Sequence, residues 1–555
     1  KPTLKGTNMV ETGNHQQGGA PTTAPAPAPH NLGLSRGPTF APAEQLLHLS
    51  YCITSNPSWH VCFILAFQHY IVMLGTTVLI ASTIVPQMGG NDGDKARVIQ
   101  VLLFMAGINT LLQTILGARL PTVMGPSFAF IISVLSTVRS YSDRDFPSNH
   151  EKFLYTMRTV QGSLIVSSFI NIVLGYSGAW ENIMRLFSPI STLPVVCLVG
   201  LGLFMRGFPQ LGNCIQIGLP MLILSIVSQQ YSKVLHEKAH HVLQRFGLLF
   251  CIALVWVFAT ILTAAGAYNN ARAVTKQSCR TDQSHLISSA PWIKIPYPFH
   301  WGAPVFKASH VFGMMGAALV SSAESTGAYF AAARLSGATP PPPHVIGRSV
   351  GFQGVGMLLD GMFGALVGNT AAVENVGLLG LTHIGSRRVV QISTIYMIFF
   401  SIFGKFGAFF ASIPLPIFSA MYCILFGIVA ATGISFIQFT NSNSIRNIYV
   451  LGLSLFLGLS ISQYFVMNTG GMGKGLVDTN SGWFDDILNT IFSSAPMVAI
   501  IVGLVLDNTL DAKSSAHERG IPWWKPFLFQ DGDMRSDEFY RLPLQVHHQI
   551  WSRFH

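Results

Sequence analysis

Long apolar runs recur along most of this chain and restrict the class of fold that it can adopt. Runs at 101–117, 248–265 and 497–506 each belong to a stretch near the ~20 residues that a helix needs to cross a bilayer. Half of the 555 residues are apolar and 10% are charged, whereas soluble domains carry roughly a quarter charged residues. The sequence therefore predicts an all-α polytopic membrane protein.

Hydropathy predicts about fourteen membrane segments, divided into two sets of seven by a polar connection. The first set spans 51–267, the connection spans 268–308 and is expected outside the cell, and the second set spans 309–506. The expected segments lie near 58–88, 97–117, 121–138, 157–180, 187–206, 211–229, 246–267, 309–333, 349–367, 371–383, 389–412, 415–435, 446–463 and 487–506.

The two ends of the chain lack apolar runs of this kind. Residues 1–50 are rich in Pro, Gly and Ala and show no apolar signal-peptide core, which predicts a disordered cytosolic tail. Residues 507–555 are polar with aromatics and are expected to form a second cytosolic tail. With both ends inside, the basic residues of the connections fall mainly on the cytoplasmic side, which favours this orientation. The plasma membrane is the expected location.

Charge and cysteine content argue against several other classes of protein. The net charge is +10, but the basic residues are scattered rather than gathered in one stripe, so a nucleic-acid partner is not expected. Most of the seven cysteines lie in apolar runs and none forms a CxxC pair, which argues against a metal site or a disulfide framework. We expect no enzyme, because no nucleophile–base pair is evident.

The two halves share local features that indicate an internal repeat. Paired prolines enter an apolar run with small residues at 188–203 and again at 411–429, in the fifth segment of each half. The third segments also match, because 121–133 and 369–382 are both short and interrupted by small or helix-breaking residues. Seven spans per repeat would invert the second copy. Interrupted segments at corresponding positions of inverted repeats indicate the substrate site of a transporter.

One of these interrupted segments carries a carboxyl group at membrane depth. Glu374 and Asn375 stand in the stretch NTAAVENVGLLGLT at 369–382, which is otherwise too apolar to face water. A charge is costly inside a bilayer and is usually kept for binding or transport. The stretch therefore predicts a substrate site within the membrane.

Several ordered motifs resemble those of the nucleobase–ascorbate transporter family, and of its plant branch with the leaf-permease type in particular. ENVGLLGLTH at 374–383 is similar to the family signature, except that His383 stands where Arg, Lys or Gly is usual. Similar landmarks are Gln68–His69, GPSFAF at 125–130, SSAESTGAYFAAARL at 321–335 and LLDG at 358–361.

The resemblance implies an architecture and a way of working. Members have fourteen segments in two inverted sets of seven, arranged as a core domain and a gate domain. The third and tenth segments each contain a short extended piece before a half-helix. Members are commonly homodimers joined through gate helices, and the core moves against the gate like an elevator.

The site residues follow from the chemistry of a flat base with N–H donors and carbonyl acceptors. The expected carboxyl acceptors are Glu324 and Glu374, while Phe128 offers a ring face for stacking. Ser127 and Val373 flank these positions and complete the predicted substrate contacts. Two alternatives stay open, because Glu324 could instead pair with Arg334 or Lys307, and Phe128 could be packing alone.

A second set of residues is expected to support the site or to carry protons. Asn375 is expected to tie the interrupted segment to its neighbours, and Thr382 to serve helix packing and hydrogen bonding. Gln68, His69 and Asp360 could be structural partners or members of a proton relay, and both interpretations stay open.

The coupling ion is predicted by comparison within the family. Its sodium-coupled ascorbate members carry an acid four residues after the glutamate of the eighth segment and Pro at the first signature position. Ala328 and Glu374 occupy these places here. We therefore predict proton-coupled import of nucleobases, with xanthine and uric acid ahead of uracil, adenine or guanine, and no cofactor besides the proton. The alternatives are a sodium–ascorbate transporter and an anion exchanger or channel of related fold, although the signature offers two acids and no fixed positive charge.

Overall fold

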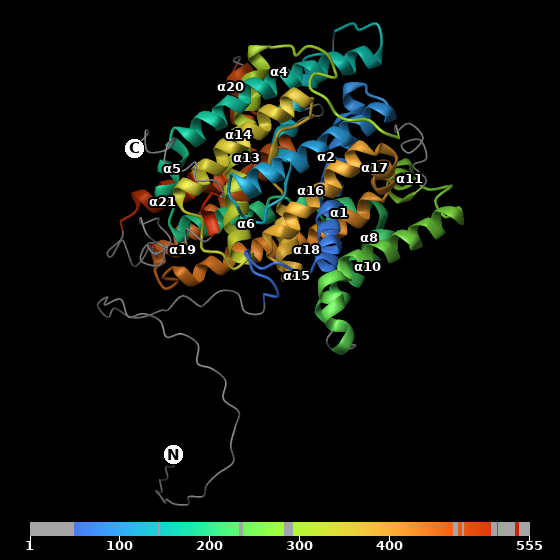
Figure 1. Ribbon diagram of the computed structural model, residues 1–555. Helices are drawn as coiled ribbons and strands as arrows, with labels where there is room; N and C mark the ends of the chain where they lie inside the picture. The colour runs from blue at the N-terminus through green and yellow to red at the C-terminus, as the bar shows by residue number, and fades with distance from the viewer. Residues whose placement is uncertain are drawn as a thin grey trace, which may run out of the picture. The chain divides into compact units, whose positions relative to one another are not determined.

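A computed structural model describes residues 49–142, 144–231, 237–281, 292–469, 475–479, 482–511, 519 and 539–542. Residues 1–48 of the predicted disordered tail and most of the predicted tail at 507–555 lie outside these residues. The described part of the chain is predominantly helical (Figure 1).

The first half contains ten α-helices in its described residues. They are α1 (Trp59–Ile84), α2 (Asp92–Ile115), α3 (Ile131–Arg139), α4 (Asn149–Tyr176), α5 (Ala179–Arg185), α6 (Pro189–Leu201), α7 (Phe208–Leu211), α8 (Ile215–Ile226), α10 (Glu237–Ala264) and α11 (Ala273–Cys279). Short 3₁₀ turns precede or follow some of them, including η2 (Phe128–Phe130) and η3 (Phe204–Arg206).

The second half contains nine α-helices in its described residues. They are α13 (Ala308–Leu335), α14 (Pro343–Phe363), α15 (Val373–Thr382), α16 (Arg387–Ile402), α17 (Gly404–Ala411), α18 (Leu415–Ile434), α19 (Ile445–Asn468), α20 (Gly482–Phe492) and α21 (Ala495–Thr509).

Seven stretches in the described residues are helical, long and apolar enough to cross a membrane, and an eighth results if the bent pair α20–α21 is one span. They are Trp59–Met88, Asp92–Ile115, Asn149–Tyr176, Pro189–Tyr231, His240–Ala264, Leu415–Phe439 and Ile445–Asn468. The protein is thus a multi-pass helical membrane protein, and the count of fourteen segments stays a prediction. Part of the difference is physical, because α3 and α15 have only 9 and 10 residues and are too short to cross alone.

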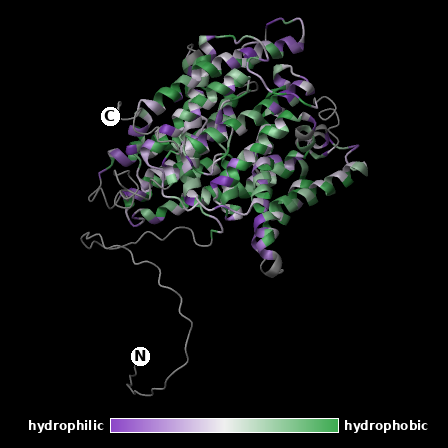
Figure 2. Cartoon of the chain, in the orientation of Figure 1, coloured by the Kyte–Doolittle hydropathy of each residue, from purple (hydrophilic) through white to green (hydrophobic). Residues whose placement is uncertain are grey.

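Side-chain exposure separates helices that face lipid from helices packed inside the protein. The long helices are mostly hydrophobic, and hydrophilic residues gather at connections such as the start of α10 (Figure 2). Along α10, Phe250, Val257 and Ile261 are each more than half exposed, as expected of side chains that contact acyl chains. In contrast α4 and α14 approach so closely that a Cβ on Gly175 would lie 2.2 Å from the backbone nitrogen of Gly351. Small residues allow such close crossings in membranes.

Two short strands lie where the resemblance implied extended pieces. β1 (Met124–Pro126) precedes η2 and α3, and β2 (Asn369–Ala371) precedes α15. The strands pair antiparallel, with Gly125 opposite Thr370, and all six residues are buried. This pairing satisfies backbone groups that would otherwise be unpaired inside the membrane. It also brings the N-terminal ends of two half-helices to one place.

The expectation about cysteines was wrong in one respect. Cys214 and Cys279 form a disulfide, with their Cα atoms 5.5 Å apart. The two residues are separated by 65 positions and belong to no spacing motif, so no local pattern indicates the bond. They meet because α11 folds back onto the turn that precedes α8. The five other cysteines are free.

A short described piece of the C-terminal region contacts the main helical body. Tyr540 is buried, and its hydroxyl donates to the carbonyl of Thr339. Arg348 donates to the Tyr540 carbonyl at 3.0 Å, and Arg387 donates to the carbonyl of Phe539 at 2.8 Å. These bonds hold the segment against the ends of α14 and α16.

Candidate functional site

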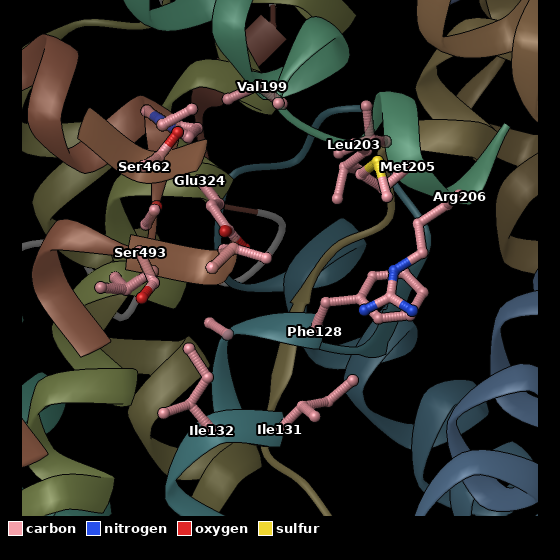
Figure 3. A pocket seen from close by; sticks show the side chains of 18 of the residues that line it. Phe128, Ile131, Ile132, Val199, Leu203, Met205, Arg206, Glu324, Ser462 and Ser493 are labelled. Atoms are coloured by element: carbon pink, nitrogen blue, oxygen red, sulfur yellow. The ribbon is translucent and has the colours of Figure 1, made fainter. Parts of the chain in front are cut away.

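A cavity of about 560 Å³ lies where the two half-helices meet, which is within the size range of small-molecule pockets. Its lining comes from both halves of the chain, from η2 and α3, from the end of α6, and from α13, α15 and α19 to α21. Figure 3 shows part of this lining, with Phe128 and Glu324 among the labelled side chains. Of the predicted substrate contacts, Phe128, Glu324, Val373 and Glu374 line the cavity.

Glu324 projects from the middle of α13 toward the start of η2. The Ser127 hydroxyl donates to Oε2 of Glu324 at 3.5 Å and accepts from the Ala129 N–H at 3.2 Å. Ser127 therefore caps the half-helix and orients the carboxyl group at once. The alternative pairings do not form, because Lys307 lies over the Tyr141 ring and Arg334 over the Phe439 ring. Within the described residues Glu324 has no ion-pair partner.

Glu374 lies in the first turn of α15 and is only 3% exposed. The Thr76 hydroxyl from α1 donates to its Oε1 at 2.5 Å, and Thr76 is 3.0 Å from the Tyr422 hydroxyl of α18. This chain of polar groups joins three helices at the cavity wall. Thr76 and Tyr422 had not been singled out, because each is an ordinary residue inside an apolar run.

The cavity also holds a basic side chain that sequence reasoning missed. Arg206 at the end of η3 places its guanidinium carbon 4.5 Å from the centre of the Phe128 ring. Figure 3 shows this arrangement, with Glu324 on another side of the cavity. The signature segment itself carries no fixed positive charge, but the cavity does. A signal existed, since Arg206 ends an expected membrane segment, but such residues are usually solvent-facing.

Four of the expected supporting residues, Gln68, His69, Asn375 and Thr382, lie behind the cavity wall rather than in it. The Asn375 amide donates to the His69 carbonyl at 2.9 Å and lies 3.1 Å from Nδ1 of the same residue, so it joins α15 to α1. Gln68 donates to the Arg245 carbonyl at 3.0 Å, which joins α1 to α10. Thr382 donates to Leu378 within its own helix at 2.7 Å.

Asp360 forms a buried polar network beneath β2. Its two oxygens accept from Asn109 at 2.9 Å and from Asn369 at 2.7 Å, and Asp360 is 2% exposed. Asn369 belongs to β2, and its carbonyl accepts from Gln353 at 2.9 Å. None of these residues lines the cavity. The arrangement holds the strand in place and favours the structural interpretation of Asp360 over the relay.

We expect Asp360→Asn to destabilise the protein while leaving substrate affinity and the pH profile of uptake unchanged. An asparagine keeps one acceptor oxygen but presents an amide donor to a neighbouring amide donor, which costs about 1–3 kcal/mol. Thermal unfolding in detergent measures the loss, with Asp92→Asn at the exposed start of α2 as control. A stable variant whose uptake no longer depends on pH would instead support the relay.

The unusual signature residue His383 has a conformational explanation. It follows the last turn of α15 with φ 57° and ψ 31°, in the left-handed region. Its carbonyl accepts from the Ser50 N–H at 2.9 Å. A helix end of this kind favours glycine, which needs no strain to adopt it. The backbone conformation is therefore one that glycine adopts without strain, and here histidine adopts it.

Comparisons with known proteins agree with this architecture. A sequence model described as the permease family (Xan_ur_permease) matches residues 60–467. Nucleobase-ascorbate transporter 3 of Arabidopsis thaliana is 64% identical over 550 residues, which cover 98% of this chain and 100% of that protein. Nucleobase-ascorbate transporter 2 of the same plant is 56% identical, over 91% of this chain and 96% of that protein. The chain therefore belongs to the nucleobase–ascorbate transporter family, and it is a membrane transporter rather than an enzyme.

Proposed function

We propose that this protein is a proton-coupled symporter that imports nucleobases, with xanthine and uric acid as its foremost substrates. The observation that carries the proposal is the convergence of Glu324, Glu374 and Phe128 on one cavity at the N-terminal ends of two half-helices. Each of these groups matches a part of a nucleobase.

The cavity offers complementary groups for the edge and the face of a purine. Carboxyl oxygens of Glu324 and Glu374 accept N–H groups of the base, and backbone N–H groups in the first turns of the half-helices donate to its carbonyls. The Phe128 ring supplies a stacking face. Val373 forms part of the cavity wall. Ser127 orients the Glu324 carboxyl group through its hydrogen bond. Xanthine and uric acid carry several N–H groups and carbonyls, so they use more of these contacts than adenine does.

Proton coupling is supported by the surroundings of Glu324. Because no cation pairs with it in the described chain, protonation neutralises the carboxyl group without breaking an ion pair. Ala328, one turn further along α13, is fully buried and offers no oxygen ligand of the kind that a sodium site gathers. We propose that Glu324 takes up a proton with the base and releases it after the inward movement. His69 stays a candidate for the relay, one step behind Asn375.

The proposal includes the architecture that the resemblance implies: fourteen segments in two inverted repeats, core and gate domains, an elevator movement and a homodimer in the plasma membrane. The disulfide supports the orientation with cytosolic ends, because it lies at the connection expected outside, and disulfides persist in oxidising compartments.

The cavity lining includes residues at helix ends that are expected on the same outer side, namely Gln87, Arg206 and Thr469. The structure thus fits an outward-facing state.

Uptake measurements separate this proposal from its alternatives. Cells that express the protein are given radiolabelled xanthine, uric acid, uracil or ascorbate at acidic and neutral external pH, with sodium present or replaced by choline. We expect xanthine and uric acid uptake to rise at acidic pH and to be indifferent to sodium. Sodium-dependent ascorbate uptake would establish the second candidate, and uptake driven by counter-anion exchange would establish the third.

A further inference from the structure

Arg206 is the basic side chain in the cavity lining, and the nucleobase contacts described so far leave it unused. It extends from η3, directly after α6, and its guanidinium covers the Phe128 ring at 4.5 Å (Figure 3). The same ring is the stacking face proposed for the base. A ligand on that face would therefore lie beside the guanidinium.

The donors of Arg206 are available to a ligand. Its side chain makes no hydrogen bond or ion pair with any described residue, and its immediate neighbours in the lining, Leu203 and Met205, are apolar. A guanidinium has five N–H donors in a planar fork and always carries its charge. Contact with an aromatic ring contributes only about 0.5–2 kcal/mol toward the hydration free energy that a guanidinium loses on burial. Apart from this ring, the described residues offer the half-buried guanidinium no partner, so its donors face water or an arriving ligand.

Other partly or fully buried arginines show what a satisfied guanidinium looks like in this protein. Arg348 donates to the carbonyls of Gly117 and Tyr540, each at 3.0 Å. Arg446 pairs with the Asp507 carboxylate at 3.0 Å. Arg206 has no acceptor of either kind in the described chain, which leaves its donors to water or to an acceptor that arrives with the substrate.

We propose that Arg206 is a specificity-determining residue that reads the carbonyl-bearing edge of the base and selects 6-oxopurines over 6-aminopurines. A 6-oxopurine presents an acceptor oxygen at position 6, whereas adenine presents an amino donor there, which faces a guanidinium unfavourably. Glu324 and Glu374 then take N–H groups from the remaining edges. The inference rests on the proposed function, and it defines the substrate class of that same site.

Hypoxanthine and adenine provide a sharp test because their ring edges differ at position 6, where an acceptor oxygen is replaced by an amino donor, and at N1, where a donor is replaced by an acceptor. The change between variants, rather than the preference of the unmodified protein, therefore isolates the contribution of Arg206. Uptake of each radiolabelled base is measured for the unmodified protein, Arg206→Lys and Arg206→Gln, normalised to protein at the cell surface. We expect the unmodified protein to prefer hypoxanthine. Arg206→Gln should raise the KM for hypoxanthine roughly 10- to 100-fold and that for adenine less than about threefold, in line with the discrimination of a bidentate arginine contact. Arg206→Lys should be intermediate, because an ammonium lacks the planar fork.

Two controls keep the result interpretable. Arg185→Gln removes a mostly exposed arginine from α5 and should change neither KM. If Arg206→Gln is present in the membrane but inactive, the shift in melting temperature caused by each base in detergent replaces the uptake measurement. Equal effects on both bases, or none, overturn the role of Arg206. If the unmodified protein neither transports nor is stabilised by any nucleobase, the proposed function itself fails.

Discussion

Replacement of Glu324 by glutamine is expected to lower xanthine uptake at acidic external pH roughly 10- to 100-fold, because it removes both a contact with the base and the group that we propose to carry the proton. Glutamine keeps the shape of the side chain and its bond with Ser127, but it presents a donor where the base also donates. It also cannot take up a proton. The remaining uptake should therefore show little dependence on external pH.

The measurement is initial uptake of radiolabelled xanthine across a range of external pH, corrected for the amount of protein at the cell surface. Glu151→Gln, an exposed glutamate in the first turn of α4, serves as the matched control and should behave like the unmodified protein. A Glu324→Gln protein that kept both its rate and its pH dependence would exclude Glu324 as substrate contact and as proton carrier.

Replacement of Gly377 by alanine is expected to remove most transport activity through a change in helix packing. A Cβ at this position of α15 would lie 2.4 Å from the backbone carbonyl oxygen of Leu425 in α18. A backbone atom cannot move aside by changing rotamer, so the helices must separate, which typically costs about 1–3 kcal/mol or more. Separation would also move Glu374 relative to Tyr422 of α18, which bonds to the same Thr76 hydroxyl.

Size-exclusion profiles and melting temperatures in detergent, together with uptake per surface molecule, measure the effect. Gly427→Ala is a suitable control on the facing helix α18, because a Cβ there meets nothing within 4 Å. Wild-type stability together with wild-type transport in Gly377→Ala would contradict the close packing of α15 against α18.

The sequence allowed the interrupted segments and the acidic residues of the cavity to be predicted, because both leave local signals. Small and helix-breaking residues at 121–133 and 369–382 mark places where an apolar helix cannot continue, and both regions contain a strand. A carboxyl group in an apolar run is costly enough to indicate function, and Glu324 and Glu374 both line the cavity.

The remaining features depend on contacts between residues far apart in the chain. Thr76 and Tyr422 are 346 positions apart, and the contact of Arg206 with Phe128 joins the end of α6 to a turn after β1. No periodicity or motif encodes such neighbours, because they result from how complete helices pack. The Cys214–Cys279 bond was missed for the same reason.

The pairing of β1 with β2 has a consequence for biosynthesis. Residues 124–126 enter the membrane early, yet the partners of their backbone groups are made only when the ribosome reaches residues 369–371. Until then the nascent chain carries unpaired peptide groups at bilayer depth, where water cannot satisfy them. We therefore expect the first half of the protein to stay incompletely folded until the second half is made. Release of a finished transporter must wait for its second half, and nonsense mutations upstream of codon 369 should leave a fragment recognised by quality control.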